Sequence, residues 1–180
     1  MGGAVGMRLA VGSDHAAYEF KLDMLKYLDE LGIEYEDFGT HSAERTDYPI
    51  WGEKVAKKVA SGEFEKGLLF CGSGIGISIS ANKVRGIRAV VCSEPYSAKL
   101  SRIHNDTNIL CMGARVVGPD LARMILDEWL KAEFEGGRHT KRVEMIAQIE
   151  SSQEQDDYTC GAVPDKKKPT GSTTGRDVMK

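Results

Sequence analysis

The sequence predicts an α/β protein in which helices cover both faces of a five-stranded parallel sheet. Short apolar segments alternate with amphipathic ones five times along the chain, a pattern that is typical of parallel sheets. The chain has 180 residues, enough for one domain with a sizeable core, and no segment repeats at a fixed period. We therefore expect one folded domain over residues 7–150, with a short extension before it and a polar tail after it.

The first two strands are expected at residues 7–12 and 33–38, separated by a helix over residues 16–31. Gly32 is placed to end that helix, and Pro49 stands near the start of the next one, which runs to residue 60 with Val55 and Val59 inward. Leucines recur every third residue in the first helix and predict its apolar face. They are Leu22, Leu25, Leu28 and Leu31.

Three further strands are expected at residues 67–70, 87–91 and 108–112, with helices beginning at Pro95 and Pro119. Gly136 and Gly137 should interrupt the chain before a last helix over residues 138–150. The inward residues predicted for the last two helices are Leu121, Met124, Ile125 and Trp129, then Val143, Ile146 and Ala147.

The composition excludes several classes of partner. Lys and Arg number 24 against 27 Asp and Glu, so the net charge of −3 gives no general attraction to nucleic acid or to anionic membranes. No apolar run approaches the ~20 residues needed to span a bilayer. Residues 1–6 make a poor signal peptide and read as a short extension, with Met7 as an alternative start. Residues 151–180 read as a disordered tail whose three adjacent lysines, 166–168, are solvated.

The cysteines indicate a reducing compartment. Cys71, Cys92, Cys111 and Cys160 show neither CxxC spacing nor a metal-binding pattern with histidine. We therefore expect reduced thiols, a cytoplasmic protein, and no bound metal or cofactor.

The stretch around Cys71 is the strongest functional signal. Gly72, Gly74 and Gly76 follow Cys71 at the end of an apolar strand, where open α/β sheets bind ligands and where glycines let backbone N–H groups approach an anion. The spacing matches neither the P-loop, nor the dinucleotide fingerprint, nor the hydrolase elbow. Cys71 is therefore either an activated thiol beside an anion site or an inert buried cysteine, while Cys92 and Cys111 are expected to be inert.

Polar residues follow other elements of the predicted fold. Asp14 and His15 come after the first strand and Tyr48 lies in the loop after the second, whereas His104 and Asn105 end the fourth helix. A histidine near a carboxylate can move protons near neutral pH. We expect these residues at the same sheet edge as Cys71, although a lone histidine is more often a surface residue.

Arginines supply the expected phosphate contacts. Arg138 and Arg142 are four residues apart and share a helix face, with His139 and Lys141 adding positive charge. Arg115 follows the fifth strand in an otherwise apolar segment. The alternative is a solvated basic face. Together with the thiol and the glycines, the arginines fit proton transfer next to a carbonyl on a phosphorylated small molecule.

Seven segments also resemble ribose-5-phosphate isomerase type B, a family of sugar-phosphate isomerases. The resemblance covers about residues 7–150, in order and without large gaps. The segments are SDHAA (13–17), ERTDYP (44–49), CGSGIG (71–76), ANK (81–83), CSEPYSA (92–98), SRIHNDTN (101–108) and EGGRH (135–139).

The resemblance implies a Rossmann-like three-layer α/β/α sandwich, acting as a homodimer or dimer of dimers in the pentose phosphate pathway. It implies that Cys71 is the base and that Ser73 and the amides of residues 72–76, including Ile75, stabilise an enediolate. Asp14 and His104 would open the sugar ring. Sugar contacts would come from Tyr48 and Asn105, and phosphate contacts from His15, Arg115, Arg138 and Arg142. The resemblance also implies a site between subunits, with His104, Asn105 and Arg115 from the partner chain.

Two alternatives remain at this point. One is the same chemistry on a six-carbon sugar phosphate, with allose 6-phosphate ahead of galactose 6-phosphate because Cys71, His104 and both helix arginines occur together. The other is a non-catalytic phosphate-binding α/β module, which predicts no turnover and tolerance of Cys71→Ala.

Overall fold

A parallel sheet of five strands forms the centre of the molecule, as the sequence predicts. The computed structural model describes residues 7–152. Its strands lie in the order β2-β1-β3-β5-β4, and every neighbouring pair is parallel. The strands are β1 (Arg8–Ser13), β2 (Glu34–Asp37), β3 (Lys66–Cys71), β4 (Ala89–Val91) and β5 (Ile109–Gly113).

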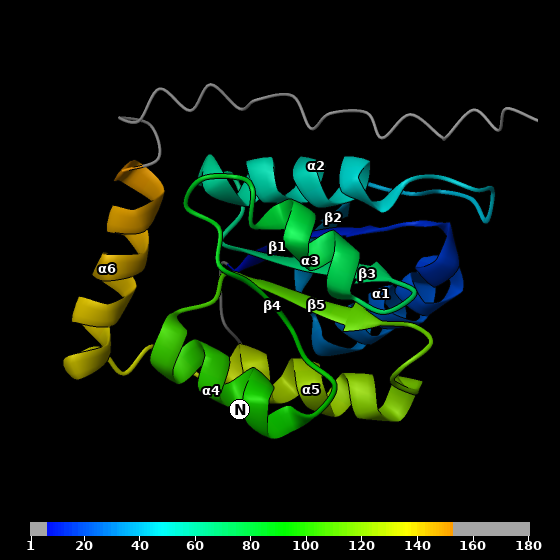
Figure 1. Ribbon diagram of the computed structural model, residues 1–180. Coiled ribbons are helices and arrows are strands. Elements are labelled where there is room, and N and C mark those ends of the chain that lie inside the picture. Colours follow the sequence, from blue (N-terminus) through cyan, green and yellow to red (C-terminus); the bar gives the residue numbers. More distant parts are fainter. Residues whose placement is uncertain (1–6, 153–180) are drawn as a thin grey trace, which may run out of the picture.

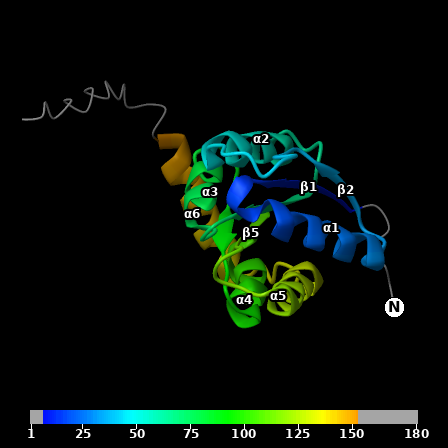
Figure 2. The ribbon, with the colours of Figure 1, turned by 90° about the vertical axis from the view of Figure 1, so that its right-hand side faces the viewer.

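Helices cover both faces of this sheet. Helices α2 and α3 lie on one face, and α1, α4 and α5 lie on the other (Figure 2). Helix α6 stands beside the sheet, at the edge where the strands begin (Figure 1). The helices are α1 (Tyr18–Leu31), α2 (Tyr48–Ala60), α3 (Ile75–Ala81), α4 (Pro95–Asn105), α5 (Pro119–Lys131) and α6 (Arg138–Ser152), and a short 3-10 turn, His15–Ala17, precedes α1.

Proline and glycine mark the helix ends where the sequence places them. Helices α2, α4 and α5 each carry a proline in their first turn, where its missing N–H removes no helical hydrogen bond. Gly32 ends α1 with φ 66°, a left-handed conformation that glycine adopts without steric cost.

The predicted apolar face of α1 is partly wrong. The buried residues of this helix are Lys21, Met24 and Leu28, and Leu31 is 43% exposed. A three-residue spacing drifts away from the 3.6-residue helical period, so a row of leucines at that spacing leaves the buried face within three turns. Leu28 is the one leucine of the predicted row that the core buries completely.

The last two helices differ from expectation in the same way. Ile125 and Trp129 of α5 are fully buried, but Met124 is 58% exposed. In α6 the predicted inward residue Ile146 is 46% exposed, and His139 is the residue of this helix that is buried. Helix α6 packs beside the end of α4 and has no sheet face to cover, so its apolar residues stay exposed.

Some predictions concern the chain ends. Helix α6 continues to Ser152, two residues past the predicted end of the domain. The expectations for residues 1–6, for the lysines at 166–168 and for Cys160 lie outside the described residues. Within residues 7–152, no helix combines the length and the apolar character needed to cross a membrane.

Candidate active site

The candidate residues fall into two groups at opposite edges of the sheet. We call the edge where the strands end the carboxyl edge, and the edge where they begin the amino edge. A pocket of about 440 Å³ opens at the carboxyl edge, and Cys71 lies in its wall. Its lining consists of Asp14, His15, Ala16, Tyr48, Cys71, Gly72, Ser73, Gly76, Arg115 and Val116.

Cys71 is the last residue of β3, and its thiol faces the glycine-rich turn. The side chain is nearly buried, and the Gly74 N–H donates a hydrogen bond to Sγ over 3.1 Å. The carbonyl of Cys71 accepts a hydrogen bond from the Ala114 N–H at 2.9 Å, which ties the strand end to the segment after β5. The sulfur is therefore held beside a backbone donor at the start of the glycine-rich turn.

Two of the glycines are required by close approach. Gly74 has φ 79°, and a Cβ there would lie 2.7 Å from Cγ2 of Val91. At Gly76 a Cβ would lie 2.7 Å from Cζ of Tyr48, so glycine is what lets the tyrosine ring rest on the first turn of α3. The glycine pattern thus shapes the pocket wall as well as freeing backbone N–H groups.

The predicted enediolate donors are only partly free in this pocket. The Gly74 N–H is directed at Cys71 Sγ, and the Ile75 N–H donates to Ser73 Oγ over 3.3 Å. The Gly76 N–H lies in the first turn of α3, where the amides have no acceptor within the helix. Of the amides that the sequence singles out, Gly76 is therefore well placed to receive an oxyanion.

Asp14 and His15 follow β1 directly and stand beside Cys71 in the pocket lining. The Asp14 carboxylate caps the short turn by accepting the Ala16 N–H at 3.0 Å. Burial raises the pKa of Asp14, and the nearby His15 partly opposes this. His15 Nδ1 lies 3.0 Å from the Thr46 carbonyl oxygen and 3.2 Å from the Thr46 nitrogen, which leaves Nε2 to meet a ligand.

Arg115 lines the same pocket as Cys71 within one chain, whereas the resemblance implies an Arg115 from the partner chain. Cys71 pairs with Gly113 across the sheet, and the parallel register continues past both strand ends. The Arg115 N–H donates to the Gly72 carbonyl over 3.0 Å, and the guanidinium lies beside Gly72. A cation therefore stands next to the thiol and the glycine turn within one chain.

His104 and Asn105 do not lie at this edge of the same chain, contrary to what the residue pattern predicts, while their supply by a partner chain stays a prediction. Helix α4 connects the end of β4 to the start of β5, so its last residues return to the amino edge. The backbone just after them pairs there, since the Gly67 N–H donates to the Asn108 carbonyl over 2.9 Å. The sequence pattern showed where α4 ends, but placing that end required the direction of the helix across the sheet.

His104 stacks on His139 at the amino edge. The ring centroids are 4.3 Å apart and the planes differ by 13°. His139 is buried, and Arg138 Nε donates to its Nε2 over 3.3 Å. Burial and the neighbouring His104 and Arg138 lower the pKa of His139. The expectation that His139 adds positive charge is therefore wrong.

The same two histidines and Glu135 have ligand atoms within 4.8 Å of one another, close enough to suggest a metal site. The nearly parallel rings disfavour one, because a metal ion binds in the plane of each imidazole ring. Arg138 also occupies the Nε2 lone pair of His139. We read the cluster as a packed histidine pair.

Arg138 and Arg142 are both exposed in the first turns of α6. Their spacing of four residues puts them on one side of the helix, as predicted. Helix α6 stands at the amino edge (Figure 1), its His139 contacts His104, and neither arginine lines the pocket of Cys71 in the same chain.

The other described cysteines are buried in the core. Burial raises the pKa of Cys92 to about 11 and that of Cys111 well above its usual value, which keeps both thiols protonated. Cys71, Cys92 and Cys111 are all unpaired.

Sequence reasoning missed the support beneath the pocket. Lys21 is fully buried, and its Nζ donates to Asp37 Oδ2 at 2.5 Å and to the Thr40 carbonyl at 2.6 Å. The Thr40 N–H in turn donates to the Ser13 carbonyl at 2.6 Å, next to Asp14. The lysine therefore fixes the loop after β2 against the end of β1. The sequence feature that could have identified Lys21 is its position on the same helical face as the buried Met24 and Leu28.

Comparison with known proteins adds to this geometry. The model of a family described as Ribose/Galactose Isomerase matches residues 9–146. The ribose-5-phosphate isomerase B of Escherichia coli is 58% identical over 143 residues, which cover 79% of this chain and 96% of that protein.

Solved structures of the same kind of enzyme have a similar fold. The ribose-5-phosphate isomerase B of Clostridium thermocellum superposes with a TM-score of 0.81 at 54% identity, over 82% of this chain and 99% of that one. The type B ribose 5-phosphate isomerase of Trypanosoma brucei has a TM-score of 0.77 at 43% identity, over 79% and 98%. At these identities the three-layer α/β/α arrangement is common to all of them.

Proposed function

Because the chain belongs to the ribose/galactose isomerase family, we propose that it interconverts ribose 5-phosphate and ribulose 5-phosphate. The observation that carries the proposal is the thiol of Cys71 in the wall of the pocket. It accepts an N–H hydrogen bond and stands beside the Gly76 amide, the Asp14 carboxyl group and the Arg115 guanidinium. This is the combination that proton transfer next to a carbonyl needs.

In the proposed reaction the Cys71 thiolate removes the proton from C2 of the open-chain aldose. The electron pair of that C–H bond forms the C1=C2 double bond, and the carbonyl oxygen at C1 takes the negative charge. The Gly76 N–H and Ser73 hold this enediolate, and Arg115 offsets its charge. Return of the proton to C1, with transfer of the O2 hydroxyl proton to O1, gives the ketose. The net change is an isomerisation, so no oxidant or cofactor is consumed.

We further propose that two copies of the chain complete each site. The partner chain would supply four residues to the Cys71 pocket: His104, Asn105, Arg138 and Arg142. His104 would act with Asp14 to open the sugar ring, and Asn105 would contact the sugar together with Tyr48. The two arginines would hold the phosphate together with His15 and Arg115. The argument is that one chain separates the two groups to opposite edges of its sheet, whereas a two-fold axis can bring unlike edges together. A homodimer is the smallest assembly with this property, and a dimer of dimers also satisfies it.

The test is a steady-state assay on ribose 5-phosphate beside allose 6-phosphate and galactose 6-phosphate. We expect the highest kcat/KM on ribose 5-phosphate. A higher value on allose 6-phosphate would make the chain a six-carbon isomerase with the same chemistry. Binding of all three sugars without turnover would instead indicate the non-catalytic phosphate-binding module.

We also infer the setting of this reaction. The free, buried thiols of the described chain suit a reducing compartment, which supports a cytoplasmic enzyme. The pentose phosphate pathway is the route in which the two proposed sugars are interconverted.

A further inference from the structure

We propose that Asp106 is a positioning residue. Two arginines clamp its carboxylate, and the clamp sets the last turn of α4 and so aims His104 and Asn105. This inference rests on the proposed function, because it assigns to Asp106 the aim of two residues that the proposed site uses. Neither the sequence pattern nor the pocket lining singles Asp106 out.

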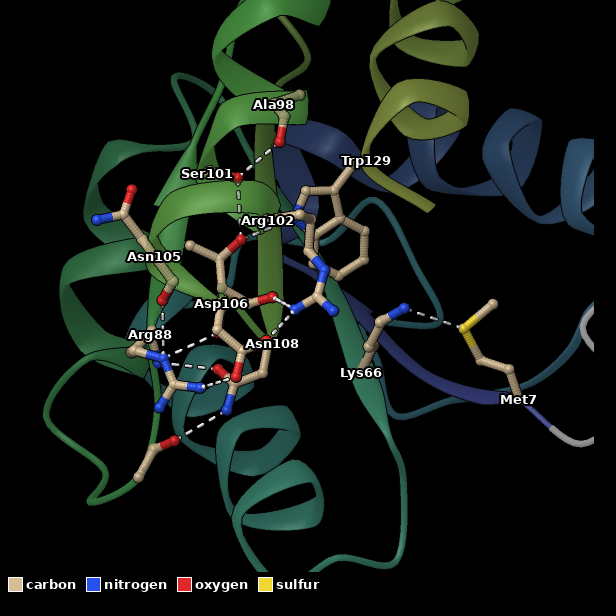
Figure 3. A network of polar contacts seen from close by, with 12 residues as sticks. Met7, Lys66, Arg88, Ala98, Ser101, Arg102, Asn105, Asp106, Asn108 and Trp129 are labelled. Atoms are coloured by element: carbon tan, nitrogen blue, oxygen red, sulfur yellow. Dashed lines mark hydrogen bonds and ion pairs between the residues drawn. The ribbon is translucent and has the colours of Figure 1, made fainter. Parts of the chain in front are cut away.

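The carboxylate of Asp106 is held from two sides (Figure 3). Arg102 Nη1 donates to Oδ1 over 2.8 Å, and Arg88 Nη2 donates to Oδ2 over 2.9 Å. The two arginines come from different elements, since Arg102 lies in α4 and Arg88 precedes β4. Each oxygen of the carboxylate thus has its own guanidinium, and the helix end is tied to the sheet.

Arg88 also holds the main chain of the residues that the site would use. Its Nε donates to the Asn105 carbonyl at 3.1 Å and to the Asp106 carbonyl at 2.8 Å. Arg88 is itself fixed, because its backbone N–H donates to Asn108 Oδ1 over 2.8 Å. Any movement of this guanidinium would therefore shift the Asn105 backbone.

Arg102 is anchored more deeply. Its side chain is 11% exposed, its guanidinium lies 5.8 Å from the Trp129 ring centroid, and Nη1 also donates to the Thr107 carbonyl over 2.5 Å. Its Nε is buried without a hydrogen-bond partner among residues 7–152. A buried cation of this kind depends on its counter-ion, and Asp106 is the carboxylate that it contacts.

The helix end alone does not require an aspartate. Asp106 has φ 48°, and its N–H donates to the Arg102 carbonyl over 3.2 Å, as a left-handed helix end does. Glycine satisfies that conformation better than aspartate. The carboxylate is therefore explained by the clamp, and this difference supplies the test.

The experiment compares Asp106→Gly with Asp106→Asn and with a control, Asp23→Asn. Glycine keeps the left-handed turn and removes the clamp, while asparagine keeps the turn and one oxygen acceptor. Asp23 also faces an arginine, Arg123 at 3.7 Å, but lies on α1. On ribose 5-phosphate we expect kcat of Asp106→Gly to fall by about tenfold to a hundredfold with little change in KM, as misplacement of a reacting group does. Asp106→Asn should be intermediate and Asp23→Asn unchanged.

A second arm tests whether Asp106 acts through its neighbours. In a background of His104→Ala with Asn105→Ala, adding Asp106→Gly should change kcat less than about twofold, because coupled residues are not additive. Wild-type kcat in Asp106→Gly, or an undiminished loss in the double-alanine background, would overturn the proposal. Melting curves of the same variants distinguish unfolding from misplacement of His104 and Asn105. If Asp106→Gly unfolds the chain, the kcat of Asp106→Asn provides the test.

A spectroscopic measurement tests the clamp independently of turnover. The imidazole signals of His104, assigned by their loss in His104→Ala, should shift in the proton–carbon spectrum of Asp106→Gly and stay in place in Asp23→Asn. An unshifted signal overturns the clamp even in an active enzyme. Absence of wild-type isomerisation, with the signal shifted, would instead overturn the proposed function alone.

Discussion

Replacing the Cys71 thiol removes the proposed base while leaving the pocket wall almost unchanged in volume. We expect Cys71→Ala to lose roughly 10²–10⁴-fold in kcat, the range for a positioned base. Cys92→Ala is the matched control, since that cysteine is also buried but its raised pKa keeps it protonated. Steady-state kinetics on ribose 5-phosphate measure both variants, and near-wild-type turnover by Cys71→Ala would refute the mechanism.

Asp14 should oppose folding at neutral pH. Burial raises its pKa, so the folded protein disfavours the ionised carboxyl group, and stability is lost as pH rises above the ordinary pKa of aspartate. Asp14→Asn removes this charge and can still accept the Ala16 N–H. We therefore expect a higher Tm for Asp14→Asn at pH 7, with the gain shrinking toward pH 4, and about tenfold to a hundredfold lower kcat.

The pH series is the decisive part of that measurement. A Tm difference that stays constant between pH 7 and pH 4 would show that titration of Asp14 is not its cause. Asp23→Asn serves as control, because the Asp23 side chain is also acidic but is 35% exposed, whereas Asp14 is buried.

At the scale of single residues, the sequence predicts some site residues and not others. Cys71, Asp14 and His15 could be named because each directly follows a strand of the predicted sheet. Arg115 could be named too, but its place in the pocket of its own chain depends on the register between β3 and β5. Lys21 was not predicted because a lysine is expected at the surface, and its burial is tolerable because Asp37 and the Thr40 carbonyl accept its hydrogen bonds.

Helix α6 tests the proposed phosphate site. Arg142→Ala removes one of the two guanidinium groups that share a side of this helix, and we expect it to weaken phosphate binding by about 1.5–3 kcal/mol, the range for hydrogen bonds to a charged group. Lys141→Ala is the control, because it removes the adjacent exposed charge from a different side of the helix. KM for ribose 5-phosphate measures both, and an unchanged KM in Arg142→Ala would mean that the helix face is only solvated.

Among the elements, type and order were predictable and buried faces were less so. The strand and helix order follows from apolar periodicity and from proline and glycine at the ends. The buried face of α1 contains Lys21, Met24 and Leu28, whereas the row of leucines predicts a neighbouring face of the helix. For α6 no count could succeed, since this helix covers no part of the sheet within its own chain.

Across the molecule, the parallel topology determines how the site is divided. Every helix that follows a strand returns to the amino edge, so residues at strand ends and residues at helix ends are separated by the length of the sheet. The residue pattern therefore indicates the right residue types without indicating that one chain keeps them apart, and only the family resemblance implies a site between subunits. Motif spacing carries no information on this division, because it depends on the direction of each element.

This division leads to a complementation test with two inactive variants. Under the proposed two-fold arrangement, each site takes Cys71 from one chain and His104 from the other. A mixed dimer of Cys71→Ala with His104→Ala then has one site with both defects and one site with none. Random exchange makes half of the dimers mixed, so the mixture should recover about a quarter of wild-type activity, as expected for a symmetric dimer with two equivalent sites. Co-expression followed by the ribose 5-phosphate assay measures this recovery, with each variant alone as the baseline. Activity that stays at the baseline in verified mixed dimers would place Cys71 and His104 in the same chain's site and refute the shared arrangement.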